Sequence, residues 1–441
     1  MVTAKGLNQL LEGRIADAEK KYGSGQKAAI EGRKQFIREF REQIGLMERV
    51  KDENGRDTAE LVESVDERGN PKLADGRLST YEFSFPEIAK AIGGEKFLES
   101  FDPNNGADAV SLMEAGPAVD PTHFLNINLF SAAVGGLVEA RTLERFKNAK
   151  WIGDDLFETR PTRKNGEKII GAGGISGADM DLTRKPGEPH ARTFFGERYV
   201  TTPELTEKAL AVEVTQEAVF YDLTGEVLDV AGEVGERLGY EREKTMLRLF
   251  AGITNSYSYG GTSYNTYQTA TPWINDHSNP LTDYADIDDA LELFTAMTNP
   301  ETGREIELMD VPTIVHDPRY VSKWHRTLNS IETRETTNTN TVTISTPVPS
   351  VAANYKLLTS VILRNLIDIE GGVTLAQAKD WWFIGNPKRA FKWMEAWPLR
   401  LRKASPNEYA MLDRGLIAAY FANYRGVGAV VEPRYMVRNK N

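Results

Sequence analysis

One segment, residues 202–251, constrains the fold more than any other, because its hydrophobic period changes along its length. Residues 210–214 alternate apolar with polar or small side chains, which is the pattern of a half-buried strand. From Asp222, a residue type that favours helix N-caps, apolar residues recur every three or four positions. The pattern predicts one amphipathic helix over 222–251, about 45 Å long at 1.5 Å per residue. Its apolar positions are Leu223, Val227, Val230, Val234, Leu238, Met246 and Leu249.

Four glycines, at positions 225, 232, 235 and 239, lie inside this predicted helix. Each one costs about 1 kcal/mol relative to alanine in a helix interior, so another interaction must compensate or bending must be useful. Two explanations stay open. Either Gly232 and Gly235 mark a bend, and alanine at both positions stiffens the helix, or they let a neighbouring strand pack closely, and alanine clashes.

Composition and charge exclude several classes of function. The chain has 441 residues, of which 40% are hydrophobic and 27% charged, so it can bury a large core in two or three subdomains. The absence of cysteine excludes disulfides and thiolate chemistry. The net charge of -11 argues against a dedicated nucleic-acid binder. No signal peptide and no membrane-spanning run is recognised, so we expect a cytoplasmic protein that does not bind membranes.

The N-terminal 70 residues are charged and have a helical period. Phe36, Ile37, Phe40 and Ile44 form one apolar stripe among basic residues. The stripe either packs surface helices on the body of the protein or belongs to a scaffolding segment that helps subunits associate. Residues 51–77 are rich in Asp, Glu, Gly and Asn, which predicts a connector.

The region 154–200 loses the helical period and becomes rich in glycine, which predicts a hairpin. Its GAGGIS run has serine where a dinucleotide-binding loop needs its third glycine, so we predict no cofactor. Residues 160–192 carry seven bases against four acids, and on an acidic chain this excess favours docking on another copy over a solvated hairpin. The seven are Arg160, Arg163, Lys164, Lys168, Arg184, Lys185 and Arg192.

Catalytic motifs are missing from the sequence. The five histidines show no metal-ligand spacing, and there is neither a phosphate-binding loop nor a nucleophile elbow. We therefore expect no enzyme, no metal and no cofactor. The tyrosine-rich stretch 256–269 predicts a surface or interface loop, and the Thr- and Asn-rich stretch 332–349 a polar loop. Strands are expected at 313–316, 416–424 and 429–435, and the aromatic residues between 381 and 397 are expected in the core.

Several segments together resemble a known family. They are VTQEAVFYD (214–222), EREKTMLRLFAG (241–252), YKLLTS (355–360), GGVTLAQAKDWWFIGNPKRAF (371–391) and GVGAVVEPRYMV (426–437). In this order they are similar to segments of tailed-bacteriophage major capsid proteins of the Hong Kong 97 type. The resemblance covers Phe124 to the C-terminus.

The resemblance implies an α+β fold built from named parts. These are an N-terminal helical segment (1–105), an N-terminal arm (106–153), an extended loop (154–200), a peripheral domain (201–310) with a spine helix (222–251), an axial domain (311–372) and return strands of both domains (373–441). It further implies that the extended loop lies across the neighbouring subunit, and that the spine helix is bent in the precursor shell and straighter after expansion.

The function implied is that of a major capsid protein. It would self-assemble, in the host cytoplasm, into the hexamers and pentamers of an icosahedral virion shell that encloses double-stranded DNA without sequence-specific binding. Portal, scaffold or decoration proteins would be further partners. The alternative is a shell protein of an encapsulin-like cellular nanocompartment.

Overall fold

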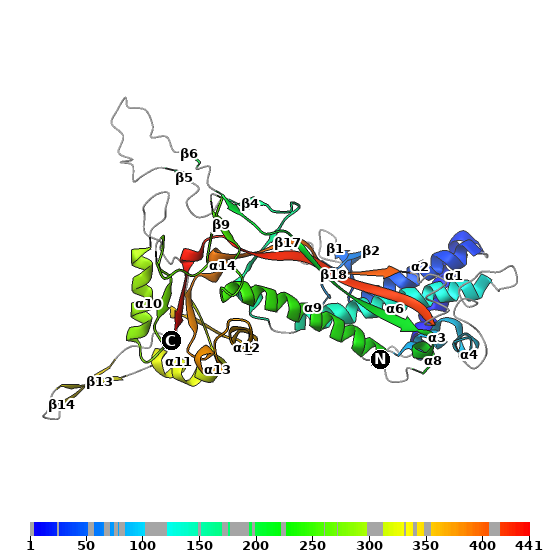
Figure 1. Ribbon diagram of the computed structural model, residues 1–441. Coiled ribbons are helices and arrows are strands. Elements are labelled where there is room, and N and C mark those ends of the chain that lie inside the picture. The colour runs from blue at the N-terminus through cyan, green and yellow to red at the C-terminus, as the bar shows by residue number, and fades with distance from the viewer. Residues whose placement is uncertain are drawn as a thin grey trace, which may run out of the picture. The chain divides into compact units, whose positions relative to one another are not determined.

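The computed structural model has helices and sheets in one chain, which confirms the α+β class (Figure 1). Two compact units divide it. The first comprises Met1–Lys150, Glu207–Tyr240 and Trp397–Arg425, and the second Trp151–Thr206, Glu241–Ala396 and Gly426–Asn441. The structure describes residues 4–23, 26–51, 57–65, 71–74, 78, 84–101, 121–148, 151–169, 175–176, 194–195, 199–221, 226–259, 261–270, 272–297, 312–329, 332–337, 342–347, 354–404 and 415–441.

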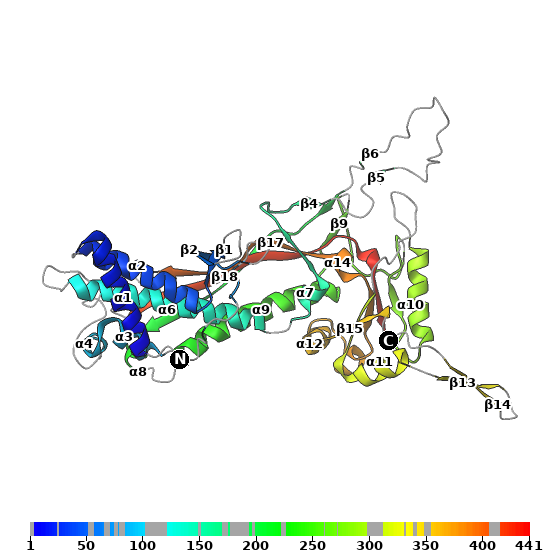
Figure 2. The same ribbon diagram turned by 180° about the vertical axis from the view of Figure 1, so that it is seen from behind.

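Helices dominate the first unit, where α1, α2, α3 and α6 pack together (Figures 1 and 2). Phe36, Phe40 and Ile44 of the predicted stripe are buried, so the stripe packs inside this unit. This confirms the packing interpretation, while the scaffolding role stays a prediction. The helices are α1 (Ala4–Tyr22), α2 (Gln26–Gln43), α3 (Phe85–Gly93), α4 (Glu95–Glu99), α6 (Pro121–Asn148), α8 (Gln216–Tyr221) and the first part of α9 (Glu226–Phe250).

The predicted connector at 51–77 contains a strand, so that prediction was wrong for part of its length. β1 (Met47–Lys51) and β2 (Asp57–Glu63) pair antiparallel, with Met47 opposite Glu63. The composition, rich in Asp, Glu, Gly and Asn, hid the strand because these residues are depleted in strands.

A four-stranded sheet has the order β3-β17-β18-β8. Its strands are β3 (Glu158–Pro161), β8 (Thr206–Thr215), β17 (Phe391–Ala404) and β18 (Leu416–Val430). The predicted alternation in β8 is confirmed, because Val212 and Val214 are buried while Ala211 and Glu213 are exposed. The predicted final strand at 429–435 was wrong: β18 continues to Val430, and the short helix Pro433–Tyr435 follows because Pro433 cannot donate to a ladder.

The second unit contains a five-stranded sheet of order β11-β19-β16-β12-β15. Trp324 of the helix α11 stacks on His316 and meets Trp382 edge-on, at ring-centroid distances of 5.4 and 5.2 Å. Trp382, Phe383, Phe391 and Trp393 are buried, which confirms the predicted aromatic core for these four, whereas Trp381 and Trp397 are half-buried. The strands are β11 (Asp276–Ser278), β12 (Thr313–His316), β15 (Lys356–Thr359), β16 (Trp382–Gly385) and β19 (Met436–Lys440), and the helices α10 (Ala285–Ala296), α11 (Val321–Leu328), α12 (Val361–Ile369), α13 (Leu375–Ala378) and α14 (Pro387–Ala390).

Two predicted loops of this unit contain strands. The stretch 332–347 forms the antiparallel pair β13 (Glu332–Thr337) and β14 (Val342–Pro347), because β-branched threonines suit a strand as well as a polar loop. The tyrosine-rich stretch contains β9 (Tyr257–Tyr259) and β10 (Thr262–Tyr264). Tyr257 and Tyr267 are buried, so part of this stretch is core. None of the helices in the described ranges is long and apolar enough to cross a membrane.

Candidate functional site

Beyond β3, which pairs parallel with β17, the described parts of the predicted extended loop include two antiparallel strand pairs. β4 (Lys168–Ile169) pairs with β7 (Val200–Thr201), and β5 (Ile175–Ser176) pairs with β6 (Phe194–Phe195). A turn precedes β4, in which Gly166 has a φ of 63°, a conformation that glycine adopts without strain. Thr202 closes the base of the loop by donating from its backbone nitrogen to the Glu167 carbonyl at 2.9 Å.

Seven basic residues of this loop were predicted to contact a neighbouring subunit. Four of them lie in its described part, and all four are exposed. Arg160 approaches Glu167 at 3.9 Å, and the Lys168 ammonium lies 4.0 Å from the centre of the Tyr199 ring. Arg163 and Lys164 lie on the turn between β3 and β4. The other three, Arg184, Lys185 and Arg192, lie outside the described residues. Docking of the loop on a neighbour stays a prediction.

The spine helix α9 contacts the root of this loop through Glu243, a residue that the sequence analysis missed. The Glu243 carboxylate accepts two hydrogen bonds from the Gly153 backbone nitrogen, at 2.9 and 3.2 Å, just before β3 begins. A Cβ on Gly153 would lie 2.5 Å from Glu243 Oε2 and 2.6 Å from Met246 Sδ, so a larger residue here would displace the Glu243 carboxylate or the Met246 side chain. The sequence signal that could have identified Glu243 is an acidic residue at a position of an amphipathic helix that is expected to be buried.

Burial sets the electrostatics of Glu243. Only 2% of its surface is exposed, and this desolvation raises its pKa to about 7, against the opposing effect of the Gly153 hydrogen bond. Asp154 raises the pKa further and Arg242, which pairs with Asp154 at 2.9 Å, lowers it. The contact therefore gains or loses a proton near neutral pH.

In the first unit, α9 packs on α6 through its glycines. A Cβ on Gly235 would lie 2.2 Å from the Thr142 carbonyl oxygen, which belongs to the α6 backbone. A Cβ on Gly232 would lie 2.9 Å from Arg145 Cγ, which is part of a flexible side chain. Close packing thus accounts for Gly235, although the neighbour is a helix and not the strand expected from the sequence. The bend at these glycines stays a prediction.

The predicted spine helix is confirmed, with described ends at Glu226 and Phe250; the predicted N-cap Asp222 lies outside the described residues. Val230, assigned to its apolar face, is 49% exposed, so that assignment was wrong. Leu238, Met246 and Leu249 are buried as predicted. Leu228 is buried too, and so are the small residues Ala231, Gly232 and Gly235, which admit α6 where valine would not.

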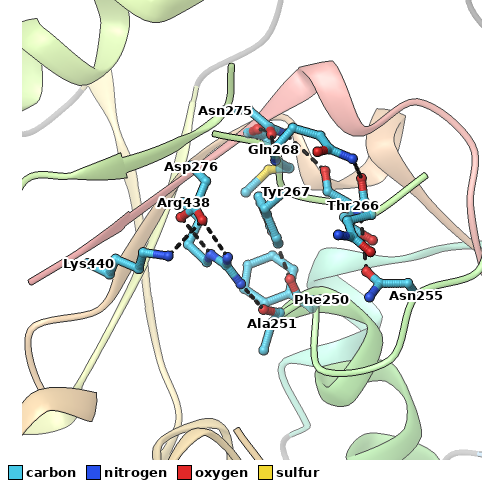
Figure 3. A network of polar contacts seen from close by, with 12 residues as sticks. Phe250, Ala251, Asn255, Thr266, Tyr267, Gln268, Asn275, Asp276, Arg438 and Lys440 are labelled. Carbon is cyan, nitrogen blue, oxygen red and sulfur yellow. Dashed lines mark hydrogen bonds and ion pairs between the residues drawn. The ribbon is translucent and has the colours of Figure 1, made fainter. Parts of the chain in front are cut away.

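The C-terminal end of α9 is held by a polar network in the second unit (Figure 3). The Tyr267 hydroxyl donates to the Phe250 carbonyl at 2.8 Å, and Arg438 donates to the Ala251 carbonyl at 3.0 Å. Both bonds satisfy carbonyls that have no partner within a helix. Arg438 also forms two hydrogen bonds to Asp276, at 3.0 and 2.7 Å, which ties α9 to β11 through β19.

A family model described as phage capsid protein matches residues 198–439, which is more than half of the chain. The chain belongs to the phage capsid protein family. As a phage capsid protein it is a component of the virion capsid, and the resemblance inferred from the sequence is confirmed. The alternative of a cellular nanocompartment shell is not favoured by this match.

Several solved capsid structures are similar to this phage capsid protein. The capsid of the cyanophage P-SCSP1u is 14% identical, with 66% of this chain and 88% of that chain covered and a TM-score of 0.39. The mature capsid of bacteriophage PhiM1 is 12% identical, with 65% and 86% covered and a TM-score of 0.38. A virus-like particle from Pyrococcus furiosus is 11% identical, with 68% and 97% covered and a TM-score of 0.35. No curated protein matches the chain.

The family match divides the capsid protein's contacts into two groups. The α9 glycines, Glu243 and the Arg438 network lie within residues 198–439. The partners on α6, the loop root at Gly153 and the loop bases lie before residue 198, outside the matched region. No group of three or more acids and histidines among the described residues is arranged to hold a metal ion.

Proposed function

We propose that this chain is the major capsid subunit of an icosahedral phage head. Its copies assemble in the host cytoplasm into hexamers and pentamers that enclose double-stranded DNA without reading its sequence. The subunit acts as a structural protein rather than an enzyme, with portal, scaffold or decoration proteins as further partners. The observation that carries the proposal is the family match over residues 198–439.

The charge distribution supports self-association through the extended loop. Arg160, Arg163 and Lys164 are exposed basic residues on a chain of net charge -11. A second copy of the chain therefore presents an acidic surface that attracts them. Exposed charges of this kind contribute little to folding and more to the rate and orientation of association. Their reversal is therefore expected to impair assembly without unfolding the subunit.

The experiment compares two triple variants of the purified full-length chain by light scattering and negative-stain electron microscopy. We expect R160E/R163E/K164E to lower the yield of capsomers and shells by about tenfold or more. The control R237E/R326E/K388E makes the same charge change at exposed positions outside the loop and should assemble normally. Stable monomers of the unaltered chain at high concentration, across salt and pH, would reject the shell function. Equal yields from both triple variants would reject only the role of the loop.

A further inference from the structure

A groove of about 400 Å³ lies between α2 and α6, which run side by side in the first unit (Figures 1 and 2). Ile30 and Ile37 of α2 line it together with Leu129 and Ala132 of α6. Ile30 and Ile37 are seven residues apart, so they lie on one face of α2 about 10 Å from each other. The packing of Phe36 and Phe40 on the unit leaves these two isoleucines only half-buried.

The rim of the groove is cationic. Arg33, Lys34 and Arg38 line it, whereas Glu31 is the single acid between Ile30 and Arg38. Lys34 pairs with Glu31 at 2.8 Å, and Arg38 acts on Glu31 only through the longer-range attraction of its charge. Arg38 forms no ion pair with any residue that the structure describes. Within the described residues, the apolar floor is thus bordered by two arginines that form no ion pair.

Arg33 is the most constrained of these cations. Its Nη2 donates to Asn126 Oδ1 at 3.0 Å, which fixes the guanidinium beside α6. Its Nε is buried, so this nitrogen is out of reach of a binding partner, and burial lowers the pKa of the guanidinium. Arg33 as a whole is only half-buried, and a guanidinium held in place at the rim is suited to a carboxylate, which accepts charge-assisted hydrogen bonds.

We propose that this groove binds an acidic amphipathic helix of another protein. Two apolar anchors of the helix fill the floor between Ile30 and Ile37, and its flanking carboxylates meet Arg33 and Arg38. This is the helix-in-groove mode of recognition, in which anchors one or two turns apart insert between two helices. The inference goes beyond assembly of like subunits and does not depend on it, because the partner is a different chain.

The shape and chemistry of the groove separate this occupant from other cation-binding partners. A nucleic-acid backbone would use the arginines but gains nothing from isoleucine and leucine. A bilayer presents a flat surface, whereas Leu129 is 4% exposed and recessed between two helices. An inserted apolar side chain reaches the floor, and acidic neighbours on the same helix complement the rim.

The test uses three fluorescein-labelled peptides and the unassembled full-length chain. The first peptide has leucines at helical spacing i, i+3 and i+7 with glutamates on both flanks. The second keeps the leucines but has lysine for glutamate, and the third keeps the glutamates but has glutamine for leucine. We expect the first to bind in fluorescence anisotropy, and the other two to bind at least about tenfold more weakly.

Two variants and one control locate the binding. Ala132→Trp fills the groove and should abolish binding, and Arg38→Glu should weaken it by about tenfold. Arg237→Glu makes the same charge change on the exposed face of α9 and should leave the affinity within about twofold. Circular dichroism confirms that each variant is folded; Arg38 is exposed, so its variant remains informative if Ala132→Trp fails to fold.

Several results would overturn the proposal. Equal binding of the acidic and basic peptides, or wild-type affinity in the folded Arg38→Glu and Ala132→Trp variants, would show that the groove is not the site. If the wild-type chain binds no peptide but sediments with phosphatidylglycerol vesicles, and both variants abolish that sedimentation, the groove contacts a membrane instead. Hydrogen exchange supplies an independent readout, because bound peptide should protect backbone amides near residues 30–38.

Discussion

The close packing of α9 on α6 makes a sharp prediction for Gly235→Ala. Alanine places a Cβ 2.2 Å from the Thr142 carbonyl oxygen and 2.9 Å from its carbonyl carbon. Ordinary van der Waals contacts are 3.4 Å or longer. Both atoms belong to backbone, so no side-chain rotation relieves the overlap. The two helices must separate at this point.

The magnitude follows from three contributions. Alanine favours the helix by about 1 kcal/mol relative to glycine. Overpacking costs about 1–3 kcal/mol, and a backbone clash lies at the upper end. Separation also strains the 3.2 Å hydrogen bond from the Thr142 hydroxyl to the Ala231 carbonyl and the 2.8 Å ion pair of Arg141 with Asp229, together about 1–2 kcal/mol. We expect a net loss of about 3 kcal/mol in the free energy of unfolding.

Thermal melting of the unassembled chain measures this loss against two internal controls. Gly13→Ala adds a Cβ in open space on α1 and should stabilise by about 0.5–1 kcal/mol. Gly232→Ala meets the flexible Arg145 side chain at 2.9 Å and should change stability by less than about 1 kcal/mol. At about 2–4 °C per kcal/mol, Gly235→Ala should melt about 6–12 °C below wild type.

An unchanged or higher melting temperature for Gly235→Ala would refute the packing argument. The bend hypothesis predicts a different pattern for the double variant at Gly232 and Gly235: altered precursor particles, but stable mature shells. Close packing predicts lower stability in every form. The unassembled chain separates the two explanations, because a bend used only during shell expansion does not affect its melting.

Two further predictions concern the other contacts of α9. The pKa of Glu243 is near 4.3 in the unfolded chain but about 7 in the folded one, so the free energy of unfolding should fall by up to about 3 kcal/mol as the pH rises between these values. Glu243→Gln should flatten this pH dependence in melting experiments from pH 5 to 8. A curve that is not flattened would contradict the assignment. Arg438→Met leaves Lys440 as the partner of Asp276 and removes the side chain that donates to the Ala251 carbonyl, so it should lower the free energy of unfolding by about 3 kcal/mol in the same assay. The control Arg326→Met, at an exposed site, should change it by less than about 0.5 kcal/mol. Equal shifts in the two variants would show that the network contributes little.

Hydrophobic periodicity predicted the long helix and its buried positions Leu238, Met246 and Leu249, but it missed part of the buried face. Period analysis weights large apolar residues, so it assigned Val230 to the interior, where the structure leaves it 49% exposed. The α6 backbone lies instead over Gly235, a position with no hydrophobicity of its own. A glycine inside a helix indicates that the helix must bend there or that another element must approach its backbone closely. Only the position of the neighbouring element distinguishes these two explanations.

The predicted contact bases and the missed Glu243 illustrate a second limit. A local excess of arginine and lysine is visible in the sequence, and the exposure of Arg160 and Arg163 agrees with it. Glu243 is one of 64 acidic residues and stands among charged neighbours. Its burial and raised pKa arise from Gly153, 90 residues earlier in the chain, so no local pattern singles it out.

Each unit holds α9 by chemistry of a different kind. Residues up to Tyr240 belong to the first unit, where a glycine admits the α6 backbone; residues from Glu241 belong to the second, where a buried acid and the terminal carbonyls are hydrogen-bonded. The first contact depends mainly on shape, whereas the Glu243 contact titrates near neutrality. A change of α9 during shell expansion that follows pH and is lost in Glu243→Gln would therefore originate at the loop root. A change that persists in that variant but is altered by Gly235→Ala would originate at the α6 contact.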